Sequence, residues 1–488
     1  MRLILGLCAT ILLACGGGKT KSGAASGAVA VRAYSATRWI PGSASYAFTA
    51  RTVREAQQGA RDLIDTFGVL AGVTVDEVSA ELTSLLLVDP LSTDSLSSIG
   101  VDLEGGFALF SESYNPTLVA RLASPPAFRA FIERQQNLKL QSVVIGGVEV
   151  FSAPLPNQMR ISWAVADDWL WIHFSLPDVP DDSATWFSAS RKPGDAKWAG
   201  DLAFAKGAGE PPVIGFLDVA RFLTDAQRRM PALAPCASSL PIANIGKLSL
   251  ALAGDGKQAN ARITLDVGSL APAIASTALP IPEGFAAATA QVPIAAQWNL
   301  DLAVVRAKAD ACMRLFDVNL RELDELGIRA GRGYLRTFDP DDREGTGAVS
   351  LDLTHKKYFE KQLDRVPSAM RSALEKKRTF GPYAGKSLSI PMFLTVDYVL
   401  TDKLALAGVG DGQLMTMIGK GGTAQGPLFE VALQPQGLSI EAWSELLGLL
   451  EIDNAKRIAE RLQRWRDARV NLTIDGTRLV FSANGTRR

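Results

Sequence analysis

The sequence predicts an α+β protein made of two related halves, each an antiparallel sheet with packed helices. Three observations predict this class: alternating apolar and polar runs, turn dipeptides between them, and the same order of segments in each half. A chain of 488 residues is long enough for more than one domain. We expect a signal peptide at 1–14, a tether at 15–32, a first half at 33–275 and a second half at 276–488.

Each half is expected to open with proline and glycine, followed by a short strand and a long helix. In both helices, apolar residues recur at the spacing that places them on one helical face. These residues are Val53, Ala56, Ala60, Ile64 and Phe67 in the first half, and Leu302, Val305, Ala309, Cys312 and Phe316 in the second. Shorter helices are predicted later in each half, at 127–132 and 358–363.

Hairpins are predicted at matching places in the two halves. One pair spans 162–174 and 394–407, and a second pair closes each half with turns at Asp255-Gly256 and Asp475-Gly476. An Asp-Gly turn between alternating runs indicates a hairpin, because both turn residues must adopt positive φ. We interpret the shared order as an internal duplication. The alternative is that two unrelated α+β segments share a common order of elements.

The charges of the chain balance, with 51 Lys and Arg residues against 51 Asp and Glu residues. This balance excludes nucleic acid as a partner, because binding to phosphates requires a basic surface. The chain after residue 14 has no uninterrupted apolar run of 18 residues, so we expect no membrane-spanning helix.

The start of the chain has the features of an export signal. An apolar stretch at 3–14 follows Met1-Arg2 and leads to Cys15 and three glycines. The run Leu12-Leu13-Ala14-Cys15 resembles the lipobox of bacterial lipoproteins, in which a peptidase cuts before the cysteine and the thiol carries a diacylglycerol. The resemblance implies that Cys15 is the mature N-terminus and is lipidated. The alternative is an ordinary secretory signal that is cut elsewhere.

The resemblance to lipoproteins also implies a location. Gly16, rather than an aspartate, follows Cys15, which in lipoproteins of double-membraned bacteria implies release from the inner membrane. We therefore expect attachment to the outer membrane, on its periplasmic or cell-surface face. Residues 15–32 are rich in Gly, Ser and Ala and are predicted to be a flexible tether between lipid and body.

Cys236 and Cys312 are the cysteines that remain in the predicted body of the protein. An exported protein is exposed to oxidising conditions, so these two residues are candidates for a disulfide. The alternative is that Cys312 is a buried free thiol, because it falls on the apolar stripe of the predicted helix.

Few residues point to catalysis or to metal binding. His173 and His355 are far apart in the sequence, with no carboxylate or thiol at metal-ligand spacing. We interpret His173 as a hydrogen-bonded strand residue, the alternative being a catalytic base. The acidic segment 339–345 lacks the glycine and glutamate that an EF-hand loop needs and is interpreted as a solvated turn. We expect no catalytic residue, no metal and no cofactor.

A cluster of tryptophans is the best candidate for a binding surface. Trp169 and Trp171 are two residues apart on one predicted strand and therefore point to the same face. With Trp163 and Trp186 they are candidates for a flat platform that binds a glycan, an apolar ligand or an envelope protein. The alternative is that the four indoles fill a core.

The segment 453–469 carries Ala455, Ile458, Leu462 and Trp465 at helical spacing, among many basic residues. We predict an amphipathic helix that packs on its own half, the alternative being a helix that lies on a lipid surface.

The body of the chain resembles uncharacterised bacterial extracytoplasmic proteins whose repeats combine a proline-rich strand, a helix and paired antiparallel strands. This resemblance rests on the order of elements and implies no catalytic residues. We expect a lipid-anchored lipoprotein of the cell envelope with a non-catalytic binding or scaffold role. The alternative is an envelope hydrolase whose carboxylates are dispersed in the sequence and gathered by the fold.

Overall fold

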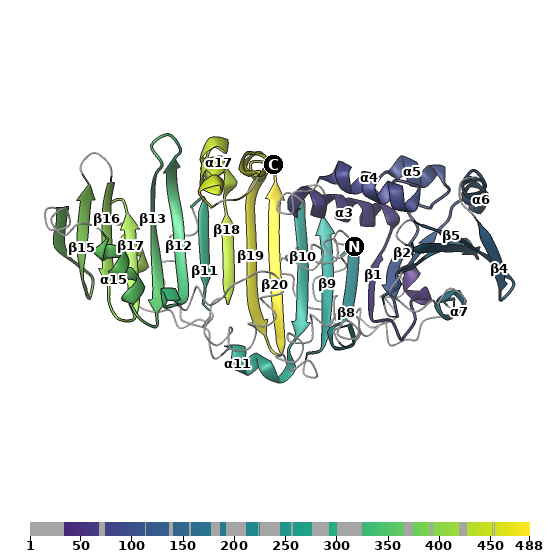
Figure 1. The fold of residues 1–488 in the computed structure, drawn as a ribbon, viewed down its shortest axis with the longest axis horizontal. Helices are drawn as coiled ribbons and strands as arrows, with labels where there is room; N and C mark the ends of the chain where they lie inside the picture. The colour runs from purple at the N-terminus through teal and green to yellow at the C-terminus, as the bar shows by residue number, and fades with distance from the viewer. Residues whose placement is uncertain are drawn as a thin grey trace. The chain divides into compact units, whose positions relative to one another are not determined.

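The structure is a computed structural model, and Figure 1 shows its fold. It describes residues 34–67, 74–112, 114–135, 140–155, 158–176, 186–191, 211–222, 224, 245–254, 257–275, 292–299, 325–365, 374–390, 394–418, 427–450, 452 and 454–488.

The strands of the described residues belong to one antiparallel sheet of 20 strands, β1–β20. The prediction of two halves that each have their own sheet and packed helices is therefore wrong, and the helices are few compared with the strands. The physical reason is that alternating residues and turn chemistry specify hairpins, but they do not specify where a sheet ends. An edge strand and an interior strand can carry the same alternation.

The chain divides into two compact units. Unit 1 comprises Met1–Arg229 and Ile245–Leu265, and unit 2 comprises Met230–Asn244 and Asp266–Arg488.

Ten of the strands lie in unit 1, and all of their mutual pairings are antiparallel. Their order across the sheet is β4-β5-β6-β7-β3-β2-β1-β8-β9-β10. Their bounds are β1 (Tyr46–Ala50), β2 (Phe107–Ser111), β3 (Thr117–Arg121), β4 (Gln141–Ile145), β5 (Val148–Pro154), β6 (Arg160–Ala166), β7 (Trp169–Ser175), β8 (Val213–Asp218), β9 (Lys247–Gly254) and β10 (Gln258–Asp266).

The ten strands of unit 2 follow the same order, β14-β15-β16-β17-β13-β12-β11-β18-β19-β20. Each strand of unit 1 thus has a counterpart in unit 2 whose number is higher by ten. Their bounds are β11 (Ile294–Trp298), β12 (Ile328–Asp339), β13 (Glu344–Leu353), β14 (Glu375–Phe380), β15 (Tyr383–Ile390), β16 (Leu394–Leu400), β17 (Leu404–Val409), β18 (Phe429–Leu433), β19 (Trp465–Asp475) and β20 (Arg478–Arg487).

The predicted hairpins are confirmed, but Asp475 pairs with Arg478, so the last turn is Gly476-Thr477 and not Asp475-Gly476. The segments 162–174 and 394–407 form the pairs β6–β7 and β16–β17, and the closing segments form β9–β10 and β19–β20. Asp167 and Asp168 turn between β6 and β7 with φ of 51° and 60°, as a tight two-residue turn requires. The Asp255-Gly256 turn lies outside the described residues.

The helices of unit 1 cover both faces of its strands. They are the 3-10 helix η1 (Ser35–Trp39) and α3 (Val53–Phe67), α4 (Val75–Leu86), α5 (Thr93–Ser98), α6 (Pro125–Glu133) and α7 (Trp186–Ser190). α3 and α6 confirm the helices predicted at 53–67 and 127–132. Figure 1 shows α3, α4 and α5 on one side of the unit 1 strands and α7 on the other.

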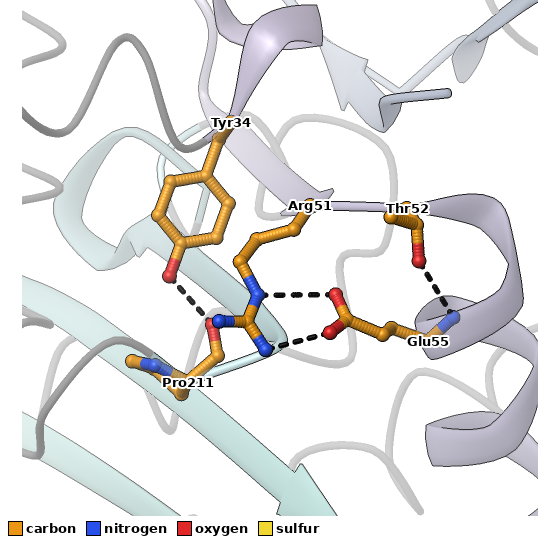
Figure 2. Close-up of polar contacts among 5 residues, drawn as sticks. All are labelled: Tyr34, Arg51, Thr52, Glu55 and Pro211. Atoms are coloured by element: carbon orange, nitrogen blue, oxygen red, sulfur yellow. Dashed lines mark hydrogen bonds and ion pairs between the residues drawn. The ribbon is translucent and has the colours of Figure 1, made fainter. Parts of the chain in front are cut away.

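The start of α3 shows how neighbouring residues specify a helix (Figure 2). The Thr52 hydroxyl accepts a hydrogen bond from the Glu55 backbone N–H at 3.1 Å, which satisfies one donor of the first turn. The Glu55 carboxylate accepts two hydrogen bonds from Arg51, from Nη2 at 2.6 Å and from Nε at 3.1 Å. Nearby, the buried Tyr34 hydroxyl donates to the Pro211 carbonyl at 2.5 Å and so holds η1 beside the start of β8.

The helices of unit 2 are short among the described residues, the longest having 10 residues. They are η5 (Gly268–Leu270), α11 (Ala271–Ala275), α15 (Lys357–Asp364), η7 (Leu414–Met417), η8 (Pro435–Gly437), α17 (Ile440–Leu449) and α18 (Ala455–Leu462). α15 confirms the helix predicted at 358–363, whereas the helix predicted from Leu302 to Phe316 lies outside the described residues.

The helix predicted at 453–469 is shorter than expected. α18 ends at Leu462, and Trp465 begins β19, where it pairs with Arg487. The indole of Trp465 packs over Gly485, where an added Cβ would lie 2.5 Å from the ring. The apolar stripe at helical spacing therefore ends where strand pairing takes over.

Candidate functional site

Three residues predicted to be functional, Cys15, Cys236 and Cys312, lie outside the described residues. Lipidation of Cys15 and a disulfide between Cys236 and Cys312 therefore stay predictions.

All four tryptophans of the predicted platform are buried in unit 1. The exposed fractions are 3% for Trp163, 3% for Trp169, 0% for Trp171 and 4% for Trp186. Three of them share one core with Trp39, between the sheet, η1 and α7. Trp163 lies in the core on the opposite face, where α6 packs, and stacks on Phe151 with ring centroids 6.3 Å apart.

The shared core is built from perpendicular ring contacts. Trp39 of η1 meets the rings of Trp171 at 5.1 Å and Trp169 at 6.0 Å. Phe187 of α7 meets Trp171 at 5.4 Å with an interplanar angle of 89°. The Arg38 guanidinium caps this cluster, 4.7 Å from the Trp39 ring and 5.1 Å from the Trp169 ring.

These positions overturn the platform interpretation. β7 is an interior strand, paired with β3 on one side and β6 on the other, and both of its faces are covered by cores. A residue on such a strand has no solvent-exposed face to offer a ligand. The four tryptophans fill cores, which is the alternative that the sequence left open.

A row of polar side chains crosses the sheet beneath the aromatic cluster. Register places Ser152, Ser162, His173 and Thr117 side by side on β5, β6, β7 and β3. The hydroxyls of Ser152 and Ser162 are 2.7 Å apart, and His173 Nδ1 is hydrogen-bonded to the Thr117 hydroxyl at 2.8 Å. The His173 imidazole, 1% exposed, also stacks on the Trp186 indole with centroids 4.7 Å apart.

This geometry agrees with the interpretation of His173 as a hydrogen-bonded strand residue. A ring that is buried and covered by Trp186 has no open face towards which a substrate could approach. The Nε1 atoms of Trp39, Trp171 and Trp186 have no hydrogen-bond partner, so three buried indole donors are unsatisfied in one core.

Among the described residues of unit 1, the exposed large apolar side chains lie on β4 or next to it. Val144 is 70% exposed, Val143 52% and the preceding Leu140 39%. Among the strands that the structure describes, β4 pairs with β5 alone, so its other edge is open. The segment from Leu140 to Val148 contains no charged residue and no proline. Sequence patterns do not reveal this site, because β4 alternates no differently from a strand with two neighbours.

The counterpart of β4 in unit 2, β14, has a different edge. β14 pairs with β15 alone among the described strands, and it carries Lys376, Lys377 and Arg378, all exposed. Charged side chains on an edge strand oppose the addition of another strand, because they would be desolvated and repelled. Of the two edges, β14 is thus protected and β4 is open.

The acidic segment 339–345 forms the turn between β12 and β13. Asp339 Oδ1 accepts hydrogen bonds from the backbone N–H groups of Asp341 and Asp342, at 2.9 and 3.4 Å. Arg343 is turned to φ 54° and pairs with Glu445 of α17 at 2.7 Å. Across the described part of the chain, no group of three or more His, Cys, Asp and Glu residues could hold a metal ion.

None of the helices in the described ranges has the length and apolar character needed to cross a bilayer.

Comparisons with known proteins return a distant structural overlap. No protein-family model and no curated protein matches the chain. Crystal form III of TP0453 overlaps with a TM-score of 0.28 and 11% identity, over 48% of this chain and 80% of that one. Crystal form I gives a TM-score of 0.28 with 10% identity, over 48% of this chain and 79% of that one. Neither overlap carries an argument about fold or function.

Proposed function

We propose that this chain is a lipid-anchored protein of the cell envelope that acts by binding a protein partner along the open edge of β4. The observation that carries the binding role is the exposure of Val143 and Val144 on an uncharged strand with one neighbour. A strand edge presents a row of backbone donors and acceptors that can pair with an added strand. Large apolar side chains beside that edge would be buried by such a partner.

The anchoring role is supported by the resemblance of Leu12-Leu13-Ala14-Cys15 to a lipobox. Two or more acyl chains hold a protein stably on a bilayer. A Gly- and Ser-rich segment of 15–32 would let the body reach partners near the membrane. We expect Cys15→Ser to move the protein from the detergent phase to the aqueous phase. Unchanged partitioning would contradict the proposed lipid anchor but would not bear on the proposed binding role of β4.

The binding role is tested by placing a charge on the open edge. Val144 lies opposite Glu149 on β5, so Val144→Lys gains a cross-strand charge pair and should leave the hairpin folded. The control is Val349→Lys on β13, because Val349 is a 38% exposed valine whose strand has a neighbour on each side, β12 and β17.

The measurement is the mass of the detergent-solubilised protein by light scattering. We expect the wild type and Val349→Lys to form an assembly heavier than one chain, and Val144→Lys to have the mass of one chain. The proposal fails if the wild type has the mass of one chain, or if Val144→Lys leaves the heavier assembly intact.

A further inference from the structure

We infer that the partner on β4 is a second copy of this chain, paired antiparallel to the first about a two-fold axis that passes through Val143. This inference rests on the proposed binding role of the β4 edge and adds the identity and register of the partner.

The hairpin of β4 with β5 determines which backbone groups of β4 face outwards. β4 and β5 are joined by the two-residue turn Gly146-Gly147, whose φ values are 57° and 80°. In such a hairpin the flanking pair, Ile145 and Val148, exchanges both of its hydrogen bonds, and the pattern alternates along the strand. The inward groups are therefore those of Ile145, Val143 and Gln141. The outward groups belong to Ser142 and Val144.

The outward backbone groups of β4 can pair with those of a second copy. An antiparallel pairing of two copies about Val143 places Ser142 opposite Val144 of the partner subunit, and Val144 opposite Ser142 of the partner subunit. These are the residues whose N–H and C=O groups face outwards, so each copy can donate and accept at the positions where the other does. A centre midway between Val143 and a neighbouring residue would place inward groups opposite outward ones. The backbone of β4 is thus self-complementary in this register.

The side chains of β4 favour Val143 as the centre of this pairing. The pairing sets Val143 against Val143 of the partner subunit at a non-hydrogen-bonded position, where side chains on facing strands come closest. Both valines are on the sheet face of the tryptophan core, next to the partly buried Ile145. The contact would extend that core across the edge and cover the side chain that unit 1 leaves 52% exposed.

The absence of charge on β4 favours a copy of the same strand as its partner. In a two-fold contact a strand faces a copy of itself, so a strand with a run of charges of one sign is repelled by its copy. The segment from Leu140 to Val148 is uncharged and meets no such penalty. β14 would face the charges of Lys376, Lys377 and Arg378 on a copy of itself. Of the two edges, β4 is therefore the one suited to self-pairing.

The test uses engineered cysteines in the full chain. At a non-hydrogen-bonded antiparallel pair, Cα atoms are about 4.5 Å apart, which is within the range that a disulfide spans. Val143→Cys should therefore form an intermolecular disulfide under mild oxidation. In Val144→Cys the two cysteines are displaced by two residues, or about 7 Å along the strands, in addition to the distance between strands. That separation exceeds disulfide reach.

We expect Val143→Cys to give a disulfide-linked species of twice the chain mass on non-reducing gels, about tenfold more than Val144→Cys or the wild type. The wild type controls for the native cysteines. Both positions are exposed, so both variants should fold, and far-UV circular dichroism checks this.

Two results would overturn the inference. In the first, Val143→Cys yields no more disulfide-linked dimer than the wild type. In the second, Val143→Cys and Val144→Cys yield equal amounts of linked dimer, which would indicate random collision. If Val143→Cys forms no intermolecular disulfide while Val144→Lys still dissociates the heavier assembly, the partner is a different protein. In that case the binding role of β4 stands and the identity of the partner is rejected.

Discussion

Replacement of Trp171 tests whether the tryptophan cluster holds the fold. Trp171 is fully buried and meets the rings of Trp39 and Phe187. A buried tryptophan removes roughly 150–250 Å² from water, and at about 25 cal/mol per Å² its loss corresponds to about 4–6 kcal/mol. The unsatisfied indole N–H offsets this by about 1–3 kcal/mol, because its removal relieves a buried donor without an acceptor. We expect Trp171→Ala to lower the free energy of unfolding by about 3–5 kcal/mol, the usual range for this truncation.

Trp171→Phe is the matched control. It keeps an aromatic ring against Trp39 and Phe187 and removes the N–H that has no partner. Phenylalanine buries less apolar area than tryptophan, which destabilises the fold, but removal of the unpaired N–H stabilises it. These two effects nearly offset each other, so we expect the free energy of unfolding to change by no more than about 1 kcal/mol.

Urea unfolding followed by far-UV circular dichroism measures both variants, because fluorescence would change with the removal of an indole. A transition that belongs to unit 2 should keep its midpoint. If Trp171→Ala unfolds within about 1 kcal/mol of the wild type, the cluster does not carry the stability of unit 1, and the core interpretation is rejected.

Three further outcomes are expected. Thr117→Val, which removes the 2.8 Å hydrogen bond to His173, should lower the free energy of unfolding by about 1–3 kcal/mol, measured by urea unfolding; no loss would mean that the bond contributes little. Gly331→Ala should destabilise unit 2 by about 1–3 kcal/mol, because its Cβ would lie 2.4 Å from the Trp298 ring; an unchanged melting temperature would show that the ring can move. The pKa of Glu441 is lowered, first by a hydrogen bond from its own backbone N–H and then by one from the serine that caps α17. The ionised carboxylate therefore stabilises the fold at pH values above the ordinary glutamate pKa, and this contribution is lost as the pH falls through the lowered pKa of the folded state. Glu441→Gln should therefore melt below the wild type at neutral pH and converge with it in acid, and a constant difference would reject the assignment.

The sequence predicts the hairpins and several helices of this protein because their signals are local. Asp167 and Asp168 tolerate the positive φ of a tight turn, and the strands on either side alternate, so β6 and β7 follow from adjacent residues. α3 follows from an apolar stripe that begins after Thr52, whose hydroxyl caps the first turn.

Local signals fail where two structures suit the same residues. Trp465 continues the apolar stripe of α18 in the sequence, yet it is the first residue of β19 and pairs with Arg487 of β20. Pairing with β20, the other strand of the closing hairpin, replaces another helical turn there, and the tertiary structure decides between the two.

What the sequence alone determines is where the chain turns, which runs alternate and which residues share a face, since these depend on backbone preferences and neighbouring side chains. The tertiary structure decides that all the described strands belong to one sheet, that Trp169 and Trp171 are covered, and that Val143 and Val144 lie on an open edge. Burial and edge position depend on which distant segments pack against a strand. β7 gains two neighbouring strands and a cover on each face, whereas β4 gains one neighbour, although both are short apolar strands in the sequence.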